Sequence, residues 1–148
     1  MSVFAIRAAC HPDCESLMVL IADHARFENG HATIERERLR GLLKRKTSPV
    51  EVFVAIAGND LAGYGALTLD FSLWRGTYWA HLDCLFVSEP YRGQGLGAQL
   101  LQHAMELAGR HSADRLEWQT PEWNSRAIAF YERQGAHSQP KVRFSLAS

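Results

Sequence analysis

The chain contains 148 residues, with 16 Lys and Arg residues balanced by 16 Asp and Glu residues. Hydrophobic residues make up 47% and charged residues 22%, which is ordinary for a globular domain and argues against a disordered chain. The formal net charge of zero argues against a dedicated nucleic-acid-binding protein, which normally carries a basic excess. We therefore expect one domain that spans residues 1–148.

The sequence also lacks the usual signals of membrane and secreted proteins. No uncharged apolar run approaches the roughly 18 residues that a membrane span needs, and residues 1–7 do not resemble a signal peptide. We expect a cytoplasmic protein that does not associate with membranes. Three cysteines, Cys10, Cys14 and Cys84, are too few for a disulfide framework. Cys10 and Cys14 flank His11, but no second ligand pair follows, so we expect no metal site.

Hydrophobic periodicity and turn residues predict alternating strands and helices. In chain order, the predicted strands are 3–8, 50–57, 61–71, 78–87, 116–119 and 142–146. The predicted helices begin after Asp13, after Thr33, near Leu96 and at Asn124 or Ser125. The three central strands follow one another without helices, which is typical of an antiparallel meander. This order predicts a mixed α/β (α+β) sheet with flanking helices rather than a doubly wound parallel sheet.

A glycine-rich loop, Arg92-Gly93-Gln94-Gly95-Leu96-Gly97, connects strand 78–87 to the longest predicted helix. The first amides of a helix carry partial positive charge, and glycines let a phosphate approach the backbone. The loop therefore fits a pyrophosphate group, with a tight turn that binds nothing as the alternative. It is not a P-loop, because no Gly-Lys-Ser/Thr follows, and its glycine spacing is not that of a dinucleotide-binding fold.

Two motifs extend this pattern. Arg92-x-x-Gly95-x-Gly97 follows a strand that ends in Leu85-Phe86-Val87, and Asn124-x-x-Ala127-x-x-Phe130-Tyr131-x-x-x-Gly135-Ala136 comes later. Together they resemble the GNAT superfamily of acyl-CoA-dependent N-acyltransferases, over most of the chain. Leu82-Asp83-x-x-Phe86-Val87, Tyr91-Arg92-Gly93 and Glu122-Trp123-Asn124 are similar to the diamine (spermidine/spermine) N-acetyltransferase branch.

The resemblance implies a mostly antiparallel sheet, splayed at its middle and flanked by about four helices, whose gap holds the pantetheine arm of acetyl-CoA. It also implies a homodimer with acceptor sites near the subunit boundary. The residues implied to bind acetyl-CoA are Leu85, Phe86, Val87, Arg92, Gly93, Gln94, Gly95, Leu96, Gly97, Ala98, Asn124 and Ala127.

Acetyl transfer needs a base for the amine proton and an acid for the departing thiolate. Tyr131 resembles the general acid of the family, and a phenol stays protonated at neutral pH; a packed tyrosine is the alternative. Asp83 falls where the polyamine branch has a glutamate, so it is a candidate anchor or base with a shorter reach. His81 is an alternative base. Strand alternation predicts one face for His81, Asp83, Leu85 and Val87.

The resemblance also suggests an acceptor cleft that prefers a cation with an apolar stem, such as a polyamine or a lysine-like amino acid. The predicted acceptor-binding residues are Phe27, Glu28, Asp83, Glu117 and Gln119. An alternative acceptor is an amino acid or an amine antibiotic, with Arg26 or Arg126 on a carboxylate. A different class remains open, a non-catalytic acyl-CoA sensor, because a fold does not by itself establish chemistry.

Overall fold

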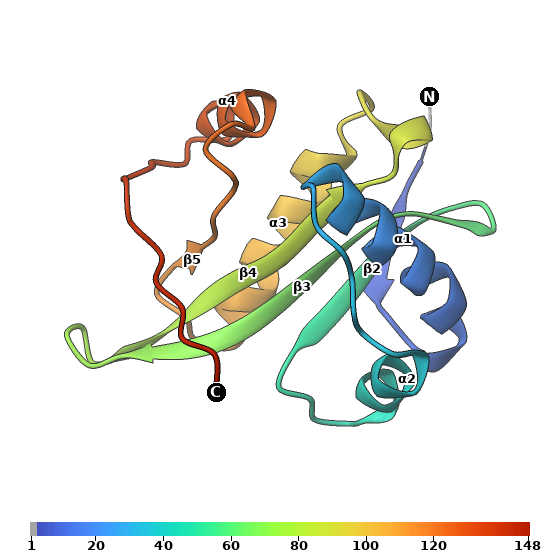
Figure 1. Ribbon diagram of the computed structural model, residues 1–148, viewed down its shortest axis with the longest axis horizontal. Coiled ribbons are helices and arrows are strands. Elements are labelled where there is room, and N and C mark those ends of the chain that lie inside the picture. The colour runs from blue at the N-terminus through green and yellow to red at the C-terminus, as the bar shows by residue number, and fades with distance from the viewer. Residues whose placement is uncertain (1–2) are drawn as a thin grey trace. The chain divides into compact units, whose positions relative to one another are not determined.

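The computed structural model describes residues 3–148 (Figure 1). The chain forms two compact units: the first ends at Trp118 and holds the sheet, and the second is Gln119–Ser148. That both units belong to one domain stays a prediction. Among the described residues, no helix is long and apolar enough to cross a bilayer.

The first unit is built on a mixed sheet with the strand order β1-β2-β3-β4-β5. The strands are β1 (Ala5–Ala8), β2 (Glu51–Ala57), β3 (Asp60–Ser72), β4 (Thr77–Val87) and β5 (Leu116–Glu117). The first four are antiparallel, whereas β5 runs parallel to β4 and pairs with it only at Ala80 and His81. The predicted mixed, mostly antiparallel sheet is therefore confirmed, although β5 is shorter than expected.

Helices cover both faces of this sheet. Helices α1 (Cys14–Phe27) and α2 (Arg36–Lys44) lie on one face, and α3 (Leu96–Arg110) lies on the other (Figure 1). The predicted start of α2 after Thr33 is wrong: Glu35 is the N-cap and keeps an extended backbone. Ile34 packs against the core beside α1, which holds the chain extended up to that point.

The core has one apolar layer on each face. The layer beneath α1 and α2 consists of Cys14, Leu17, Leu20, Leu39, Val54, Tyr64 and Phe86. On the α3 face, the Phe53 ring packs so closely on Gly65 that a Cβ there would lie 2.2 Å from the ring. A Cβ on Gly63 would lie 3.1 Å from Leu100 of α3. These two glycines let β3 approach Phe53 and α3.

A β-bulge interrupts the pairing of β3 with β4. Ala66 pairs with Cys84, but Leu67 pairs with Leu82, so Asp83 is an extra residue in β4. Such an insertion bends the strand and changes the direction of its side chains. Sequence alternation alone could not show it, because a bulge is a property of the two strands together.

The bulge makes the predicted common face wrong. His81 pairs with Thr68, on the face covered by α1 and α2, whereas Leu85 pairs with Gly65 on the α3 face. Residues directly opposite in an antiparallel pair share a face. His81 therefore faces away from Leu85 and Val87. Asp83 is the extra residue at the point where the facing of the strand changes.

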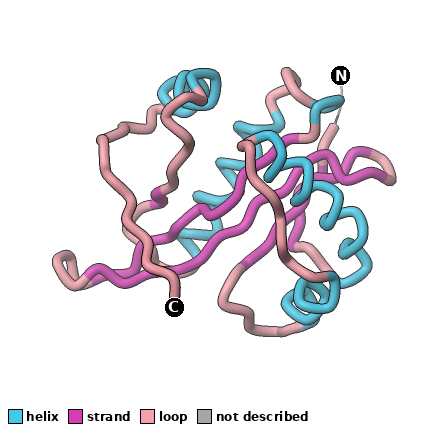
Figure 2. Tube along the Cα trace, viewed as in Figure 1, coloured by secondary structure: helices cyan, strands magenta, loops and turns pink. Residues whose placement is uncertain are grey.

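The second unit contains α4 (Ser125–Arg133), followed by Gly135 with φ +91°. The strand predicted over Val142–Leu146 is wrong, because residues 136–148 form neither helix nor strand (Figure 2). Val142, Phe144 and Leu146 alternate as in an amphipathic strand but are exposed. A strand is stabilised by cross-strand contacts, and within residues 3–148 no strand pairs with this segment.

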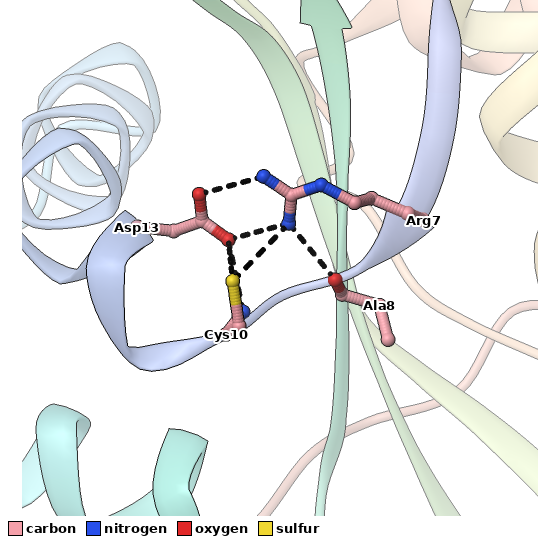
Figure 3. Close-up of polar contacts among 4 residues, drawn as sticks. All are labelled: Arg7, Ala8, Cys10 and Asp13. Carbon is pink, nitrogen blue, oxygen red and sulfur yellow. Dashed lines mark hydrogen bonds and ion pairs between the residues drawn. The ribbon is translucent and has the colours of Figure 1, made fainter.

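Arg7 and Asp13 connect β1 to the start of α1 (Figure 3). Two guanidinium nitrogens of Arg7 donate to the Asp13 carboxylate at 2.7 and 2.9 Å, and the Cys10 amide donates to it at 2.9 Å. Asp13 occupies the predicted N-cap position of α1, but its buried side chain makes no capping hydrogen bond. It closes the preceding turn instead. The Arg7 hydrogen bonds, above all, lower the pKa of Asp13.

We expect Asp13→Asn to lower the free energy of unfolding by about 2 kcal/mol at pH 7, because a buried charge-assisted pair is broken. A depressed carboxylate pKa stabilises the fold above the ordinary aspartate pKa, and this contribution is lost as the pH falls through the folded-state value. Urea unfolding should therefore show a difference from wild type that shrinks in acid. Asp70→Asn, in an exposed part of β3, is the control. An Asp13 difference that is constant with pH would contradict the assignment.

Candidate active site

The loop between β4 and α3 has an open backbone. Gly93 and Gly95 adopt φ values of +76° and +82°, and no atom lies within 4 Å of a Cβ built on either residue. Gly95 is the N-cap of α3, so the first amides of the helix have no acceptor within the helix itself. Exposed glycines next to a helix N-terminus fit the predicted phosphate-binding role. That the backbone amides of Gly93, Gly95 and Gly97 bind a pyrophosphate stays a prediction.

Arg92 links this loop to the end of α1. Its Nε donates to the Val87 carbonyl oxygen at 2.9 Å. Its guanidinium carbon lies 5.0 Å from the centre of the Phe27 ring and 5.4 Å from that of Phe86. These are distances of favourable cation–π contact. The structure thus brings the predicted acceptor residue Phe27 next to the predicted donor loop.

The other predicted donor residues at this end of β4 differ in exposure. The Phe86 side chain is buried beneath α1, so its backbone is the part that could face a ligand. Leu85 and Val87 are half-buried on the α3 face, and Gln94 is exposed, with its amide nitrogen 3.4 Å from the Pro90 carbonyl oxygen. Leu96 is buried in the core, whereas Gly97 and Ala98 remain partly exposed. Their roles in donor binding stay predictions.

Two of the predicted acceptor carboxylates converge on one tyrosine. Glu28 follows the last turn of α1, Asp83 is the bulge residue of β4, and both side chains are exposed. The pKa of the buried Tyr64 is raised by burial, then by Cys84, and then by the negative charges of Asp83 and Glu28. Two carboxylates that act on the same tyrosine, one of them next to Phe27 in the sequence, are suited to a cation with an apolar stem.

His81 and Glu117 lie together at the junction of β4 and β5, where they are paired across the two strands. Glu117 Oε2 is 3.7 Å from an Arg115 guanidinium nitrogen, and the His81 ring contacts Trp79 edge-on. Both side chains therefore have partners within the protein, and their positions need no ligand to explain them. Whether either one touches an acceptor stays a prediction.

The remaining predicted residues belong to the second unit. Asn124 caps α4, because its side-chain oxygen accepts a hydrogen bond from the Ala127 amide at 3.3 Å. Tyr131 lies within α4 next to Phe130, with the two ring centres 5.3 Å apart. Gln119 begins the unit. The capping role of Asn124 is thus confirmed, and the donor, acid and acceptor roles of these residues stay predictions.

Sequence reasoning missed three side chains at the site. The His24 Nδ1 atom lies 2.7 Å from the Tyr64 hydroxyl, and its Nε2 lies 2.8 Å from Glu28 Oε2. Cys84 packs against the core cluster that contains Tyr64, and its Sγ lies 3.6 Å from Asp83 Oδ2. The i,i+4 spacing of His24 and Glu28 on a helix was a visible signal. Nothing in the sequence distinguished Tyr64 from other strand tyrosines.

Comparison with known proteins decides the family. Residues 14–136 match the Acetyltransferase (GNAT) family. The chain belongs to this family. A thialysine N-epsilon-acetyltransferase from Caenorhabditis elegans is 31% identical, over 89% of this chain and 82% of the relative. The peptidyl-lysine N-acetyltransferase YjaB of Salmonella typhimurium is 38% identical, over 88% and 81%. A solved integron cassette protein from Vibrio cholerae has a TM-score of 0.77 and 26% identity, covering 98% of this chain and 93% of that one.

The protein is therefore a GNAT N-acetyltransferase. The thialysine enzymes belong to the spermidine/spermine branch, so the predicted branch is confirmed as well. The family implies an acyl-CoA donor and a small amine acceptor. Within residues 3–148, no three His, Cys, Asp or Glu side chains are grouped so that they could hold a metal ion.

Proposed function

We propose that this GNAT enzyme transfers the acetyl group of acetyl-CoA to a primary amine of a small cationic acceptor, by direct attack in a ternary complex. The observation that carries the proposal is the contact of Arg92 of the glycine loop with Phe27, which directly precedes Glu28. The charges of Glu28 and Asp83 both act on the buried Tyr64. The acceptor class is a polyamine or the side-chain amine of a lysine-like amino acid. The similarity to a thialysine acetyltransferase supports the same class.

The proposed acceptor site matches the chemistry of such an amine. An alkyl ammonium group has a pKa near 10.4, so the acceptor arrives charged at neutral pH. The carboxylates of Glu28 and Asp83 attract this charge, and the Phe27 ring, which is half exposed, packs against the methylene stem. Glu117, on the neighbouring strand β5, is proposed to add a further negative charge for the same acceptor. An anionic acceptor would be repelled by the same groups.

The proposed reaction divides the proton transfers between two residues. Asp83 accepts the proton of the acceptor ammonium, with His81 as the alternative base, and Tyr131 donates a proton to the departing thiolate. The donor supplies an activated thioester carbonyl. Amides of the loop from Gly93 to Ala98, together with Arg92, Asn124 and Ala127, hold the donor in position, which reduces the entropic cost of the encounter.

A thiol-release assay with acetyl-CoA and a panel of acceptors tests the function. We expect spermidine and thialysine to give kcat/KM values at least about tenfold above those of neutral amino acids, because one additional ion pair contributes roughly 1.4 kcal/mol. A lysine-containing peptide is included because YjaB acts on peptidyl-lysine. Preference for an acidic acceptor, or the absence of thiol release with any amine, would contradict the proposal.

The alternative acceptor, an amino acid held through its carboxylate, needs a free arginine. Arg26 already forms an ion pair with Asp23 on the exposed side of α1, which weakens its case. Measuring the Arg26→Ala variant with the same panel of acceptors distinguishes the cationic acceptor from the amino acid held through its carboxylate. Unchanged kcat/KM for both spermidine and thialysine supports the cationic site, whereas a loss confined to acceptors that carry a carboxylate, thialysine included, would favour the alternative.

We also propose that the enzyme is a homodimer, as its branch implies. The β3–β4 hairpin supports this proposal because it exposes Phe71, Leu73 and Trp74, of which Trp74 is 99% exposed. Apolar clusters of this kind often mark a protein interface. A molar mass of one chain, measured by light scattering across the micromolar range, would contradict the dimer.

A further inference from the structure

The Glu28 carboxylate of the proposed acceptor site is held by a histidine that the reaction has not so far used. We propose that His24, itself fixed by Tyr64, is a positioning residue that holds the Glu28 carboxylate in place for the cationic acceptor. This inference rests on the proposed function, because Glu28 is an acceptor-binding residue only under that proposal. It deepens the function by giving two further side chains a part in acceptor recognition.

Two hydrogen bonds connect the core to this carboxylate. The Nδ1 atom of His24 lies 2.7 Å from the Tyr64 hydroxyl oxygen, and its Nε2 atom lies 2.8 Å from Glu28 Oε2. Tyr64 is buried in the layer beneath α1, whereas 15% of the His24 side chain and 39% of the Glu28 side chain are exposed. The three side chains thus lead from the core to solvent, and the group that a ligand can reach most easily is the carboxylate.

The proton positions follow from the two groups that flank the histidine. An ionised carboxylate only accepts hydrogen bonds, so the Nε2–H of His24 donates to Glu28. Burial above all raises the pKa of Tyr64, so its hydroxyl keeps its proton and donates to Nδ1 of the neutral imidazole. A neutral ring in this tautomer orients Glu28 without cancelling its negative charge, which stays available for an ammonium group.

Glu28 needs such a partner because of its place in the fold. It is the C-cap residue of α1, where the partial negative charge of the last carbonyl groups repels a carboxylate. An exposed glutamate side chain also samples several rotamers, and ordering it on binding costs entropy. The hydrogen bond from His24, one helical turn earlier, orders the carboxylate before an acceptor arrives and thereby favours binding.

The Phe86 ring also fixes His24, and it connects the histidine to the glycine loop. The His24 ring is stacked on Phe86, with the ring centres 5.0 Å apart and the ring planes 21° apart. The guanidinium carbon of Arg92 lies 5.4 Å from the centre of the same ring, and the centre of the Phe27 ring lies 6.4 Å from it. His24 therefore shares a neighbour with the loop cation and with the aromatic ring of the proposed acceptor site.

The nearby arginines leave the Glu28 charge free for a ligand. Arg26 forms its ion pair with Asp23 on α1, and Arg92 contacts aromatic rings and a backbone carbonyl oxygen. Within residues 3–148, Glu28 pairs with His24 and with no lysine or arginine. A carboxylate that is held by a neutral donor, rather than by a resident cation, can form an ion pair with an incoming ammonium group.

A double-mutant cycle tests whether His24 acts through Glu28. We expect Glu28→Gln to raise the KM for spermidine about tenfold with kcat unchanged, because one charge-assisted contact is lost from substrate and transition state alike. His24→Asn should raise this KM about fivefold, within the range of coupled neighbours. In the double variant, the KM should equal that of Glu28→Gln alone. The KM for acetyl-CoA should stay at the wild-type value throughout.

His24→Gln is the matched variant. The glutamine amide extends as far as Nε2 of the histidine and can donate to Glu28, whereas the asparagine amide ends where Nδ1 lies. We therefore expect the KM for spermidine to stay near the wild-type value in His24→Gln only, although both variants lose the stacking on Phe86.

Tyr64→Phe keeps the buried ring and removes only the hydroxyl, so it tests the positioning role even if His24→Asn does not fold. We expect a smaller rise in the KM for spermidine than His24→Asn gives, and no further rise when it is combined with Glu28→Gln. Tyr78→Phe, which changes an exposed tyrosine of β4, is the control and should match wild type. Thermal unfolding identifies the variants that fold.

These results separate the positioning role from the function itself. If Glu28→Gln raises the KM for spermidine, additive effects of the Glu28 and His24 substitutions would overturn the positioning role and leave the proposed function intact. Equal KM values for His24→Gln and His24→Asn would do the same. An unchanged KM in Glu28→Gln would instead remove Glu28 from the acceptor site, and the positioning role with it. A wild-type enzyme that releases no thiol with any amine would overturn the proposed function, on which this inference rests.

Discussion

Binding of acetyl-CoA should weaken at least about 100-fold when Gly95 is replaced by tryptophan. The residue has φ +82° and open space around its Cβ position, so the indole would enter the region in front of the first amides of α3. Blocking two charge-assisted hydrogen bonds to phosphate, at roughly 1.5 kcal/mol each, gives this loss. Isothermal titration calorimetry with CoA measures it directly.

The matched control is Gly58→Trp. Gly58 lies in the β2–β3 turn with φ +62° and equally open space, so the substitution carries similar backbone strain away from the loop. Thermal unfolding should show similar Tm changes for both variants, while only Gly95→Trp loses CoA binding. A folded Gly95→Trp variant with wild-type CoA affinity would show that the loop does not hold the donor.

Local signals in the sequence were sufficient for most of the fold. The long helix predicted near residues 96–111 is α3 (Leu96–Arg110), because its apolar stripe is continuous and it follows a glycine in the left-handed region. The three central strands were found within a few residues, since their β-branched runs are bounded by turn residues. In these elements local preference and tertiary packing agree.

Features that depend on pairing could not be predicted in the same way. The bulge at Asp83 reverses the face of β4 between Leu82 and Cys84, and nothing in the alternation of β4 alone encodes it. In the segment Val142–Leu146 the local pattern is present but the pairing is missing. Its alternation is typical of a strand, but a strand also needs a neighbour, and the sequence does not say whether one exists.

The candidate site shows the same division. The glycine loop, Glu28 and Asp83 could be predicted as site residues because they lie within or beside sequence motifs that resemble the family. The link from Glu28 through His24 to Tyr64 joins two different elements, α1 and β3. Such contacts arise from the register of the strands and from the position at which α1 crosses them. A one-residue change in the β3–β4 register would move Tyr64 to the other face of the sheet and break the link.

The proposed division of labour makes the base and acid ends of the reaction separable by experiment. The proposed base, Asp83, acts before or during attack of the amine, and Tyr131 acts when the thiolate departs. Substitutions at the two ends should therefore respond differently to the leaving group. A donor thioester with a more acidic thiol should relieve the defect of a Tyr131 variant but not that of Asp83→Asn, because only departure of the thiolate becomes easier.

Tyr131→Phe is expected to lower kcat about 100- to 1000-fold, as loss of a positioned general acid commonly does. The phenylalanine ring preserves the packing next to Phe130 in α4, and the substitution removes none of the groups proposed to hold the donor, so the Kd for CoA should remain at the wild-type value. Pre-steady-state thiol release and CoA calorimetry on the same preparation measure the two quantities. Wild-type turnover in this variant would remove Tyr131 from the mechanism, and a matching loss of CoA affinity would make it a binding residue instead.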